Sequence, residues 1–304
     1  MGSVLLPQQL MTIPDAQRLG VPMTGMLKHR TLPALLAPAA LVVGQNACRR
    51  ERPDALLAWG RRPSALRVER LGQHWNLPVW HLEDGLLRSL GKGRQHPPLA
   101  LLVDDLGVHF DATRPSRLEQ RIQQPLTQAQ AARARSLRDL WCTQRLSKLN
   151  PSRESPAPAG PFVLVVDQSA GDRSIALGQA GPENFRRMLA VALEHNPDCT
   201  VVVKVHPDVI RGRARGHFRP ADLRHPRIQL CSDGLHPAAL LEGARAVYVV
   251  TSQMGFEALL WGRTVHCFGM PFYAGWGLTR DRIAAPSRRN AAVPLEAVVH
   301  AALV

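Results

Sequence analysis

Short apolar runs that alternate with amphipathic stretches constrain the fold of this 304-residue chain more than any other feature of its sequence. The alternation extends from Leu32 to about Asp105 and is typical of an α/β fold, in which buried strands and helices follow one another. It predicts strands at Ala39–Val43, Ala55–Trp59 and Leu77–Leu82, and a helix over Pro63–Leu71.

A second series of the same kind follows a break in the pattern. The segment Asn150–Pro161 holds four prolines together with serine and glycine, which is the composition of a linker. We therefore expect an amino-terminal domain over residues 1–155 and a carboxy-terminal domain over residues 156–304, both doubly wound and Rossmann-like and facing a central cleft. Ligands bind such sheets at the carboxyl ends of the strands. In the second domain the predicted strands are Phe162–Val166, Thr200–Val205 and Ala246–Val250, and the predicted helices are Pro182–His195, Pro237–Ala244 and one that starts within Thr251–Leu260.

The charge balance favours anionic partners. Lysine and arginine number 38 against 24 acidic residues, for a net charge of +14, and only four of the basic residues are lysine. Phosphates, acidic sugars, anionic lipid and nucleic acid all fit such a chain. Arginines spread over solvated faces account for the charge equally well.

Cysteine usage and hydropathy bear on the compartment. The five cysteines form no CxxC pair, and their odd number argues against a closed disulfide framework. No apolar run reaches the roughly 18 residues of a membrane span, and the amino terminus lacks the pattern of a signal peptide. We expect a protein of the reducing cytoplasm, whose basic surface could touch a membrane.

Adjacent carboxylates follow the predicted strand Leu77–Leu82. Glu83 and Asp84 stand there before Gly85, which permits a tight turn. Either carboxylate could act as a general acid or base in a cleft. The alternative is a turn or helix cap, in which Asp84 accepts a backbone N–H.

A hairpin is predicted further along the first domain. Leu99–Val103 has the pattern of a strand, and the residues that follow it alternate again around Gly107, which predicts a turn at that glycine. Asp104 and Asp105 are adjacent, a poor spacing for a divalent metal, so turn chemistry is the better interpretation.

Polar residues also follow the first predicted strand of the second domain. Asp167, Gln168, Ser169 and Asp172 form a loop directly after Phe162–Val166. Either aspartate could act as a nucleophile. Asp172 could equally cap the helix that begins near Ser174.

Cationic and hydroxyl groups follow the other two strands of this domain. Lys204 and His206 share one face of the strand end, and Pro207 ends the strand ladder. Two donors side by side at a crevice suit a phosphate. Thr251 and Ser252 stand where a helix begins, a position that attracts anions, although Ser252 could serve as a plain cap.

Two families of nucleotide sites lack support in the sequence. There is no GxGxxG fingerprint and no Walker loop, so neither a dinucleotide nor an ATP-type site is indicated.

These segments, in this order, resemble the bacterial capsule-polysaccharide β-Kdo transferases. The most specific are LEDGLLRS at Leu82–Ser89 and GMPFYAGWGLT at Gly269–Thr279. The resemblance covers about Thr24 to the carboxyl terminus. Its other segments are Gly60–Ser64, Pro97–Leu99, Asp104–Gly107, Phe110–Ser116, Val166–Ser169 with Gly171–Asp172, Lys204–Pro207 and Thr251–Ala258.

The resemblance implies a GT-B-like retaining glycosyltransferase that uses CMP-β-Kdo and lies in the cytoplasm, peripheral to the inner membrane. Lys204, His206 and the helix start at Thr251 and Ser252 would supply the positive charge that the departing phosphate needs, so we expect neither a metal nor a bound cofactor. The second domain would bind the nucleotide sugar and the first would face the acceptor. Complete enzymes of this family carry two such modules and build a short poly-Kdo linker on lysophosphatidylglycerol. This chain has room for one module, and it resembles the amino-terminal one. The implied partners are CMP-Kdo, a phospholipid-linked acceptor, an anionic membrane surface and, as further candidates, other capsule-assembly proteins.

Retention at a ketosidic carbon is most simply obtained by two inversions, which require a nucleophile and an acid/base. The resemblance places a reactive aspartate in the 167–172 loop, so we expect Asp172 to be the nucleophile, with Asp167 as the alternative. Glu83 is the expected acid/base, with Asp84 in reserve. The residues expected to bind the donor are Lys204, His206, Pro207, Thr251, Ser252, Gln168, Ser169 and Tyr273.

Two other functions fit part of the pattern. A transferase for another nucleotide sugar, such as a sialyltransferase-like enzyme, would use the same phosphate-binding residues. A basic nucleic-acid-binding protein fits the charge, but the arginines form no evident recognition helix and aromatic residues make up only 5% of the chain. We therefore expect no nucleic-acid partner.

Overall fold

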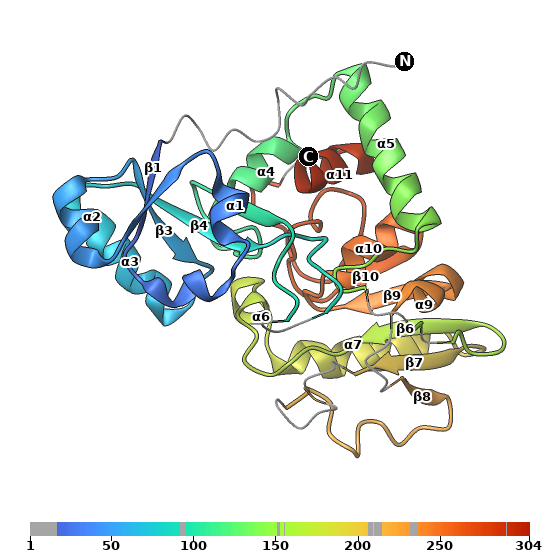
Figure 1. The fold of residues 1–304 in the computed structure, drawn as a ribbon. Helices are drawn as coiled ribbons and strands as arrows, with labels where there is room; N and C mark the ends of the chain where they lie inside the picture. The colour runs from blue at the N-terminus through green and yellow to red at the C-terminus, as the bar shows by residue number, and fades with distance from the viewer. Residues whose placement is uncertain are drawn as a thin grey trace.

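Two β-sheets form the framework of the structure, and helices flank both of them (Figure 1). The computed structural model describes residues 17–91, 95–150, 153–154, 156–205, 209, 215–231, 236–289 and 291–304. The predicted residues His206 and Pro207 lie outside this part of the chain. The first sheet, in blue, is separate from the second, which runs from yellow-green to orange.

The first sheet has five strands in the order β2-β1-β3-β4-β5. The first four run parallel, and β5 runs antiparallel to β4 at the edge. The prediction of a doubly wound sheet is confirmed, with this one antiparallel strand added. Its elements are β1 (Arg18–Val21), the 3-10 helix η1 (Thr24–Lys28), α1 (Leu32–Leu36), β2 (Ala40–Val43), α2 (Gln45–Glu51), β3 (Ala55–Trp59), α3 (Pro63–Trp75), β4 (Val79–Asp84) and β5 (Leu101–Asp104).

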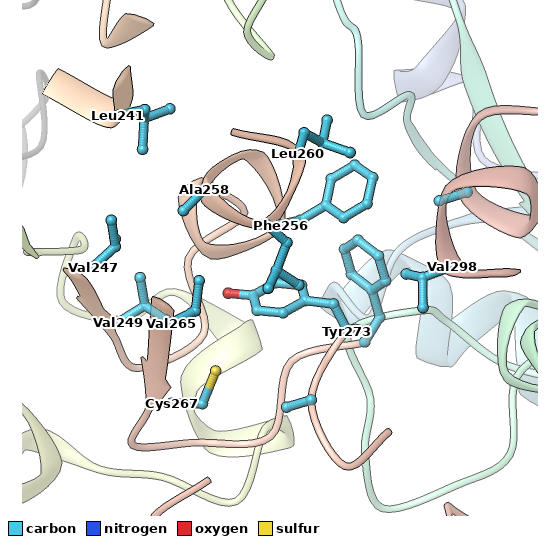
Figure 2. Close-up of a cluster of buried hydrophobic side chains, with 14 of the residues drawn as sticks. Leu241, Val247, Val249, Phe256, Ala258, Leu260, Val265, Cys267, Tyr273 and Val298 are labelled. Atoms are coloured by element: carbon cyan, nitrogen blue, oxygen red, sulfur yellow. The ribbon is translucent and has the colours of Figure 1, made fainter. Parts of the chain in front are cut away.

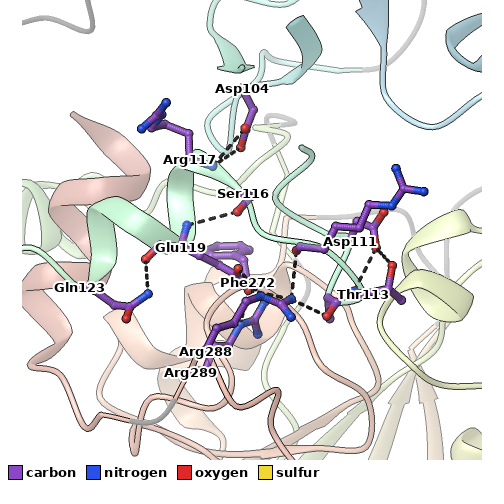
Figure 3. A network of polar contacts seen from close by, with 12 residues as sticks. Asp104, Asp111, Thr113, Ser116, Arg117, Glu119, Gln123, Phe272, Arg288 and Arg289 are labelled. Atoms are coloured by element: carbon purple, nitrogen blue, oxygen red, sulfur yellow. Dashed lines mark hydrogen bonds and ion pairs between the residues drawn. The ribbon is translucent and has the colours of Figure 1, made fainter. Parts of the chain in front are cut away.

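The predicted hairpin around Gly107 is wrong. Strand β5 pairs with β4 instead, and no strand follows it before helix α4 (Arg117–Ile122) in the described chain. The reason is the Asp104 carboxylate, which accepts the N–H groups of Gly107 at 2.8 Å and Arg117 at 2.9 Å (Figure 3). These bonds turn the chain away from the sheet.

The second sheet has six parallel strands in the order β11-β10-β9-β6-β7-β8. This is the strand order of the Rossmann fold, with its topological switch point between β6 and β9, where ligands bind. Strand β6 and helix α7 have the predicted bounds. The elements are β6 (Phe162–Val166), α6 (Arg173–Leu177), α7 (Pro182–His195), β7 (Thr200–Lys204), β8 (Ile228–Cys231), α9 (Ala238–Gly243), β9 (Ala246–Val249), α10 (Met254–Leu260), β10 (Thr264–Cys267) and β11 (Arg280–Asp281).

Helix α10 packs its apolar side onto the second sheet. Figure 2 shows Phe256 and Ala258 of this helix together with side chains of β9 and β10 and with Val298. Val298 belongs to the carboxy-terminal helix α11 (Leu295–Leu303). The chain therefore ends in the core of the second domain.

Helix α11 also packs against helices that precede the predicted domain boundary. These are α4 and α5 (Gln128–Thr143), and Figure 1 shows α5 and α11 beside each other. Trp141 of α5 is 2% exposed and belongs to the same core as α10. The boundary at residues 155 and 156 stays a prediction: the two sheets lie on either side of it, while α4 and α5 pack with the second domain.

A buried ion-pair network joins α4 to the segment after β11. Glu119 of α4 accepts hydrogen bonds from Arg288 at 2.7 Å and from Arg289 at 2.6 Å (Figure 3). The Arg289 side chain is 1% exposed and also donates to the carbonyls of Pro271 at 2.7 Å and Ala274 at 3.0 Å. The described hydrogen-bond partners of the Arg289 guanidinium are thus one carboxylate and two backbone carbonyls, and the fold holds all three in place.

Removing the Glu119 carboxylate is expected to destabilise the fold strongly. Glu119→Gln leaves the buried Arg289 charge without its counter-ion, a change that typically costs about 3–5 kcal/mol. Equilibrium urea unfolding measures the loss. Asp139→Asn is the matched control, because Asp139 is 64% exposed and pairs with Arg138 on the surface; its loss should stay below about 0.5 kcal/mol. Similar losses for the two variants would contradict the assigned importance of the network.

Candidate active site

A cleft of about 580 Å³ opens between the two sheets. Residues from the carboxyl ends of β4, β6 and β7 line it, so both domains contribute walls. The structure brings these predicted site residues together in the cleft: Glu83, Asp84, Gln168, Asp172, Lys204, Thr251 and Ser252, together with the alternative nucleophile Asp167.

Glu83 leaves the end of β4 and packs against Gly60. Gly60 has a φ of +55°, and a methyl group added to it would overlap Oε1 of Glu83. A glycine is therefore required at this position both for the backbone and for the carboxylate. Burial raises the pKa of Glu83 to about 7, against the opposing charge of Lys148.

Asp84 holds a neighbouring loop. Its Oδ2 accepts a hydrogen bond at 2.7 Å from Nε of Arg88, which is itself 6% exposed. Its Oδ1 is buried and has no hydrogen-bond partner among the described residues. Asp84 thus lines the cleft and also holds the Arg88 side chain, whereas the alternative prediction was a cap that accepts a backbone N–H.

Asp172 fills the capping role that the sequence left open, and it also lies at the cleft. It is the N-cap of α6, because Oδ1 accepts the N–H of Ser174 at 2.9 Å. The residue is exposed, and it lines the cleft. The second oxygen, Oδ2, lies 3.5 Å from Nε2 of Gln168. The capping bond thus fixes Oδ1 of Asp172, while Oδ2 faces Gln168, which lines the cleft.

Asp167 is placed differently. It is 4% exposed and accepts the N–H groups of Gln168 at 2.8 Å and His217 at 3.1 Å. Burial raises its pKa. Both hydrogen bonds go to Oδ1, so Asp167 fastens the 215–217 segment to the end of β6.

Gln168 and Thr251 join the two strands at the switch point. The Thr251 N–H donates to Oε1 of Gln168 at 3.0 Å, and Nε2 of Gln168 donates to the Thr251 hydroxyl at 3.0 Å. The Ser174 hydroxyl lies 3.1 Å from that of Thr251. This polar cluster closes the floor of the cleft between β6 and β9. Ser169, in contrast, is not among the residues that line the cleft.

The start of α10 agrees with expectation, whereas the position of Tyr273 differs from it. The helix begins at Met254, within the predicted range Thr251–Leu260, and the Ser252 hydroxyl accepts the Met254 N–H at 3.3 Å. Tyr273 is fully buried beside Phe256 (Figure 2), and its hydroxyl donates to the Ser252 carbonyl at 2.5 Å. It therefore supports the cleft wall from behind instead of lining it. The aromatic and glycine residues of Gly269–Thr279 do not reveal from sequence alone whether Tyr273 lines the cleft or packs behind its wall.

Three residues of the cleft were missed by sequence reasoning. Glu257 is 1% exposed, accepts a hydrogen bond from the Ser147 hydroxyl at 2.6 Å, and has its pKa raised to about 7 by burial. Lys148 lies near both Glu83 and Glu257. Burial lowers the pKa of His109 to about 3, so this imidazole is neutral. Glu257 stood inside the quoted 251–258 segment, whereas Lys148 follows no strand and carried no signal.

The described residues include no candidate metal site. No group of three or more histidine, cysteine, aspartate or glutamate side chains there could hold a metal ion.

The raised pKa of Glu83 predicts an unusual dependence of stability on pH. A carboxyl group with a pKa near 7 in the folded state and 4.5 in the unfolded state favours unfolding increasingly as pH rises between these values. Glu83→Gln removes this effect, so it should gain about 3 kcal/mol over the parent protein on going from about pH 4.5 to about pH 8. Urea unfolding at several pH values measures the difference.

Glu154 provides a control of opposite sign. Arg145 lowers the pKa of this exposed carboxyl, so its stabilising contribution is present at neutral pH and fades as pH falls. Glu154→Gln should therefore lose stability toward neutral pH. A Glu83→Gln profile parallel to that of the parent would show that Glu83 titrates alike in both states.

Known proteins match most of the chain. "Capsule polysaccharide modification protein LipA" of Neisseria meningitidis serogroup A is 40% identical over 240 residues, which are 75% of this chain and 34% of that protein. "Lipopolysaccharide-processing protein LpsZ" of Rhizobium meliloti is 36% identical over 245 residues, 78% of this chain and 55% of that protein. The chain thus spans about a third to a half of the length of these relatives.

Solved structures extend the likeness to the fold. The Thermosulfurimonas dismutans KpsC β-Kdo 2,4 transferase has a TM-score of 0.86 and 36% identity, over 94% of this chain and 90% of that chain. The β-Kdo 2,7 transferase of the same KpsC has a TM-score of 0.70 and 28% identity, over 95% of this chain and 90% of that chain. The expected GT-B-like arrangement of two Rossmann-like domains is confirmed.

The family comparison agrees with both results. Capsule polysaccharide biosynthesis proteins match residues 54–150 and 121–304, which include both walls of the cleft. The chain belongs to the capsule polysaccharide biosynthesis protein family.

Proposed function

We propose that the chain is a retaining glycosyltransferase that moves β-Kdo from CMP-Kdo to a lipid-linked acceptor in capsule polysaccharide synthesis. The likeness to the KpsC β-Kdo 2,4 transferase over 94% of the chain carries the proposal. The cleft supports it independently, because carboxylates and cations from two Rossmann-like sheets converge there.

The second domain is the proposed donor side. Lys204 ends β7 in the cleft and is 7% exposed, so its charge acts at a site with little water. Cytidine monophosphate is the leaving group in this reaction, and positive charge preorganised near its phosphate would stabilise the departing anion. His206 and Pro207 are proposed for the same site on the sequence pattern alone.

Asp172 is the proposed nucleophile. One of its carboxylate oxygens would attack the anomeric carbon of Kdo, the bond from that carbon to the phosphate would break, and CMP would leave with the electron pair. Asp172 suits this step better than Asp167, because Asp172 is exposed at the cleft whereas Asp167 is buried and accepts two backbone N–H groups. The Ser174 N–H would hold the attacking carboxylate in a fixed orientation.

Glu83 is the proposed base of the second step. The acceptor hydroxyl would lose its proton to Glu83 and attack the same carbon, which would release Asp172 and restore the β configuration. A carboxyl group with a pKa of about 7 is suited to accept a proton near neutral pH. No metal and no bound cofactor takes part in this proposal.

The two carboxylates should fail in different ways. Asp172→Asn should form no covalent sugar adduct, since an amide attacks far more slowly than a carboxylate. Glu83→Gln should accumulate the adduct, because phosphate leaves without a proton while the acceptor hydroxyl needs a base. Intact-protein mass spectrometry after exposure to CMP-Kdo distinguishes the two.

Asp105→Asn is the control for this experiment, because Asp105 pairs with Arg117 and does not line the cleft; it should behave like the parent protein. An adduct that persists in Asp172→Asn would transfer the role to Asp167, Glu83 or Asp84. Absence of an adduct in every variant would favour front-face retention over the double displacement.

Loss of the Lys204 ammonium should weaken nucleotide binding. A buried charge-assisted contact to phosphate contributes about 2–3 kcal/mol, so Lys204→Ala should bind CMP roughly 30- to 150-fold more weakly. Calorimetry with CMP measures this affinity, with Arg219→Ala as a control on the exposed surface away from the cleft. Unchanged affinity in Lys204→Ala would move the nucleotide site elsewhere.

The donor itself is tested by nucleotide release with CMP-Kdo, CMP-sialic acid and UDP-sugars. Release from CMP-Kdo alone supports the proposal. Preference for another donor would favour a transferase of different sugar specificity.

A further inference from the structure

Three exposed leucines gather on the loop that joins β4 to β5. Leu90 is 63% exposed, Leu99 is 66% exposed and Leu87 is 37% exposed. They are three of the seven large apolar side chains that are exposed in the described chain. A single exposed leucine needs no explanation, but a group on one loop marks an interaction surface.

A buried arginine holds the described parts of the loop together. The Arg88 guanidinium donates to the carbonyls of Gly91 and His96, both at 2.9 Å, and to the Asp84 carboxylate at 2.7 Å. The Leu99 N–H donates to the Arg88 carbonyl at 2.8 Å. The leucines are therefore held at the surface by a scaffold of satisfied hydrogen bonds.

Basic residues stand on the segment that is fastened to this loop. The Thr31 hydroxyl donates to the Pro98 carbonyl at 2.6 Å, one residue before Leu99. Lys28, the last residue of η1, and Arg30 lie within three residues of this anchor; both are exposed, and no ion pair joins either to another described residue. Apolar side chains next to free cations are typical of proteins that lie in the interface of an anionic bilayer.

The loop also borders the cleft. Leu86 and Asp84 line the cleft and directly precede Leu87, and Gln253 of the opposite domain donates to the Leu86 carbonyl at 2.6 Å. A ligand that reaches Glu83 thus passes close to the loop.

We infer that Leu87, Leu90, Leu99, Lys28 and Arg30 form a docking surface that binds an anionic phospholipid bilayer and turns the mouth of the cleft toward it. The leucines enter the boundary between headgroups and acyl chains, and the two cations contact anionic headgroups. This inference rests on the proposed function, since a lipid-linked acceptor would be presented at such a surface. No helix in the described ranges is long and apolar enough to cross a membrane.

Vesicle cosedimentation tests the docking surface directly. The probes are vesicles of phosphatidylcholine alone and of phosphatidylcholine with phosphatidylglycerol. Leu90→Glu/Leu99→Glu should need roughly tenfold more phosphatidylglycerol-containing lipid for half-maximal binding than the parent protein. Lys28→Glu/Arg30→Glu should show a similar loss that added salt reduces.

Leu140→Glu/Leu230→Glu is the matched control. These leucines are 51% and 50% exposed and lie on α5 and β8, outside the docking surface. The control carries the same added charge and should bind vesicles as the parent protein does. Equal binding by the docking and control variants would overturn the inference, as would equal binding of the parent protein to both kinds of vesicle. Binding of the docking surface to an acidic protein and not to vesicles would overturn it as well.

A lipid-free readout separates this inference from the proposed function. Leu90→Glu/Leu99→Glu should still form a sugar adduct with CMP-Kdo in solution when combined with Glu83→Gln, because neither leucine touches the donor side. Loss of vesicle binding with the adduct retained supports the docking surface. An absent adduct with vesicle binding altered as expected would contradict only the chemistry of the proposed transferase.

Discussion

The buried pairing of Glu119 with Arg288 and Arg289 is the contact on which the rest of the structure depends. Arg289 also binds the Pro271 and Ala274 carbonyls, on either side of Phe272, which lines the cleft. Glu119 belongs to α4, directly after the loop that carries the cleft residue Phe110. One charge network thereby positions aromatic residues from distant parts of the chain at the same opening, and its burial makes loss of either charge costly.

Two buried carboxyl groups define the electrostatics of the cleft. Glu83 and Glu257 both have their pKa raised to about 7, and Lys148 lies near each. One lysine cannot fully balance two carboxylates that are also shielded from water. Proton occupancy of Glu83 and Glu257 is therefore sensitive to pH near neutrality, which is the range where acid–base chemistry needs a group to change its protonation state.

The sequence predicted the fold better than it predicted the fine placement of the site. Strands β3 and β6 and helix α7 have their predicted bounds, because each is a strongly patterned stretch between clear breakers. The hairpin at Gly107 failed because three backbone N–H groups converge on Asp104. Those of Leu106 and Gly107 form a local turn, but that of Arg117 lies 13 residues further along the chain and has no local signal. Tyr273 shows that a position inside a motif does not reveal whether a side chain faces the cleft or the core that supports it. Lys148 lines the cleft from outside any motif, so the sequence carried no signal for it.

The amide of Gln168 spans the switch point with both of its polar ends engaged. Its oxygen accepts the Thr251 N–H and its nitrogen donates to the Thr251 hydroxyl, so β6 and β9 are fixed relative to each other before any ligand arrives. A ligand that binds against this floor meets dipoles already oriented. The entropy of ordering that wall is lost during folding and not during binding, so affinity at this part of the cleft is not reduced by reorganisation of the protein.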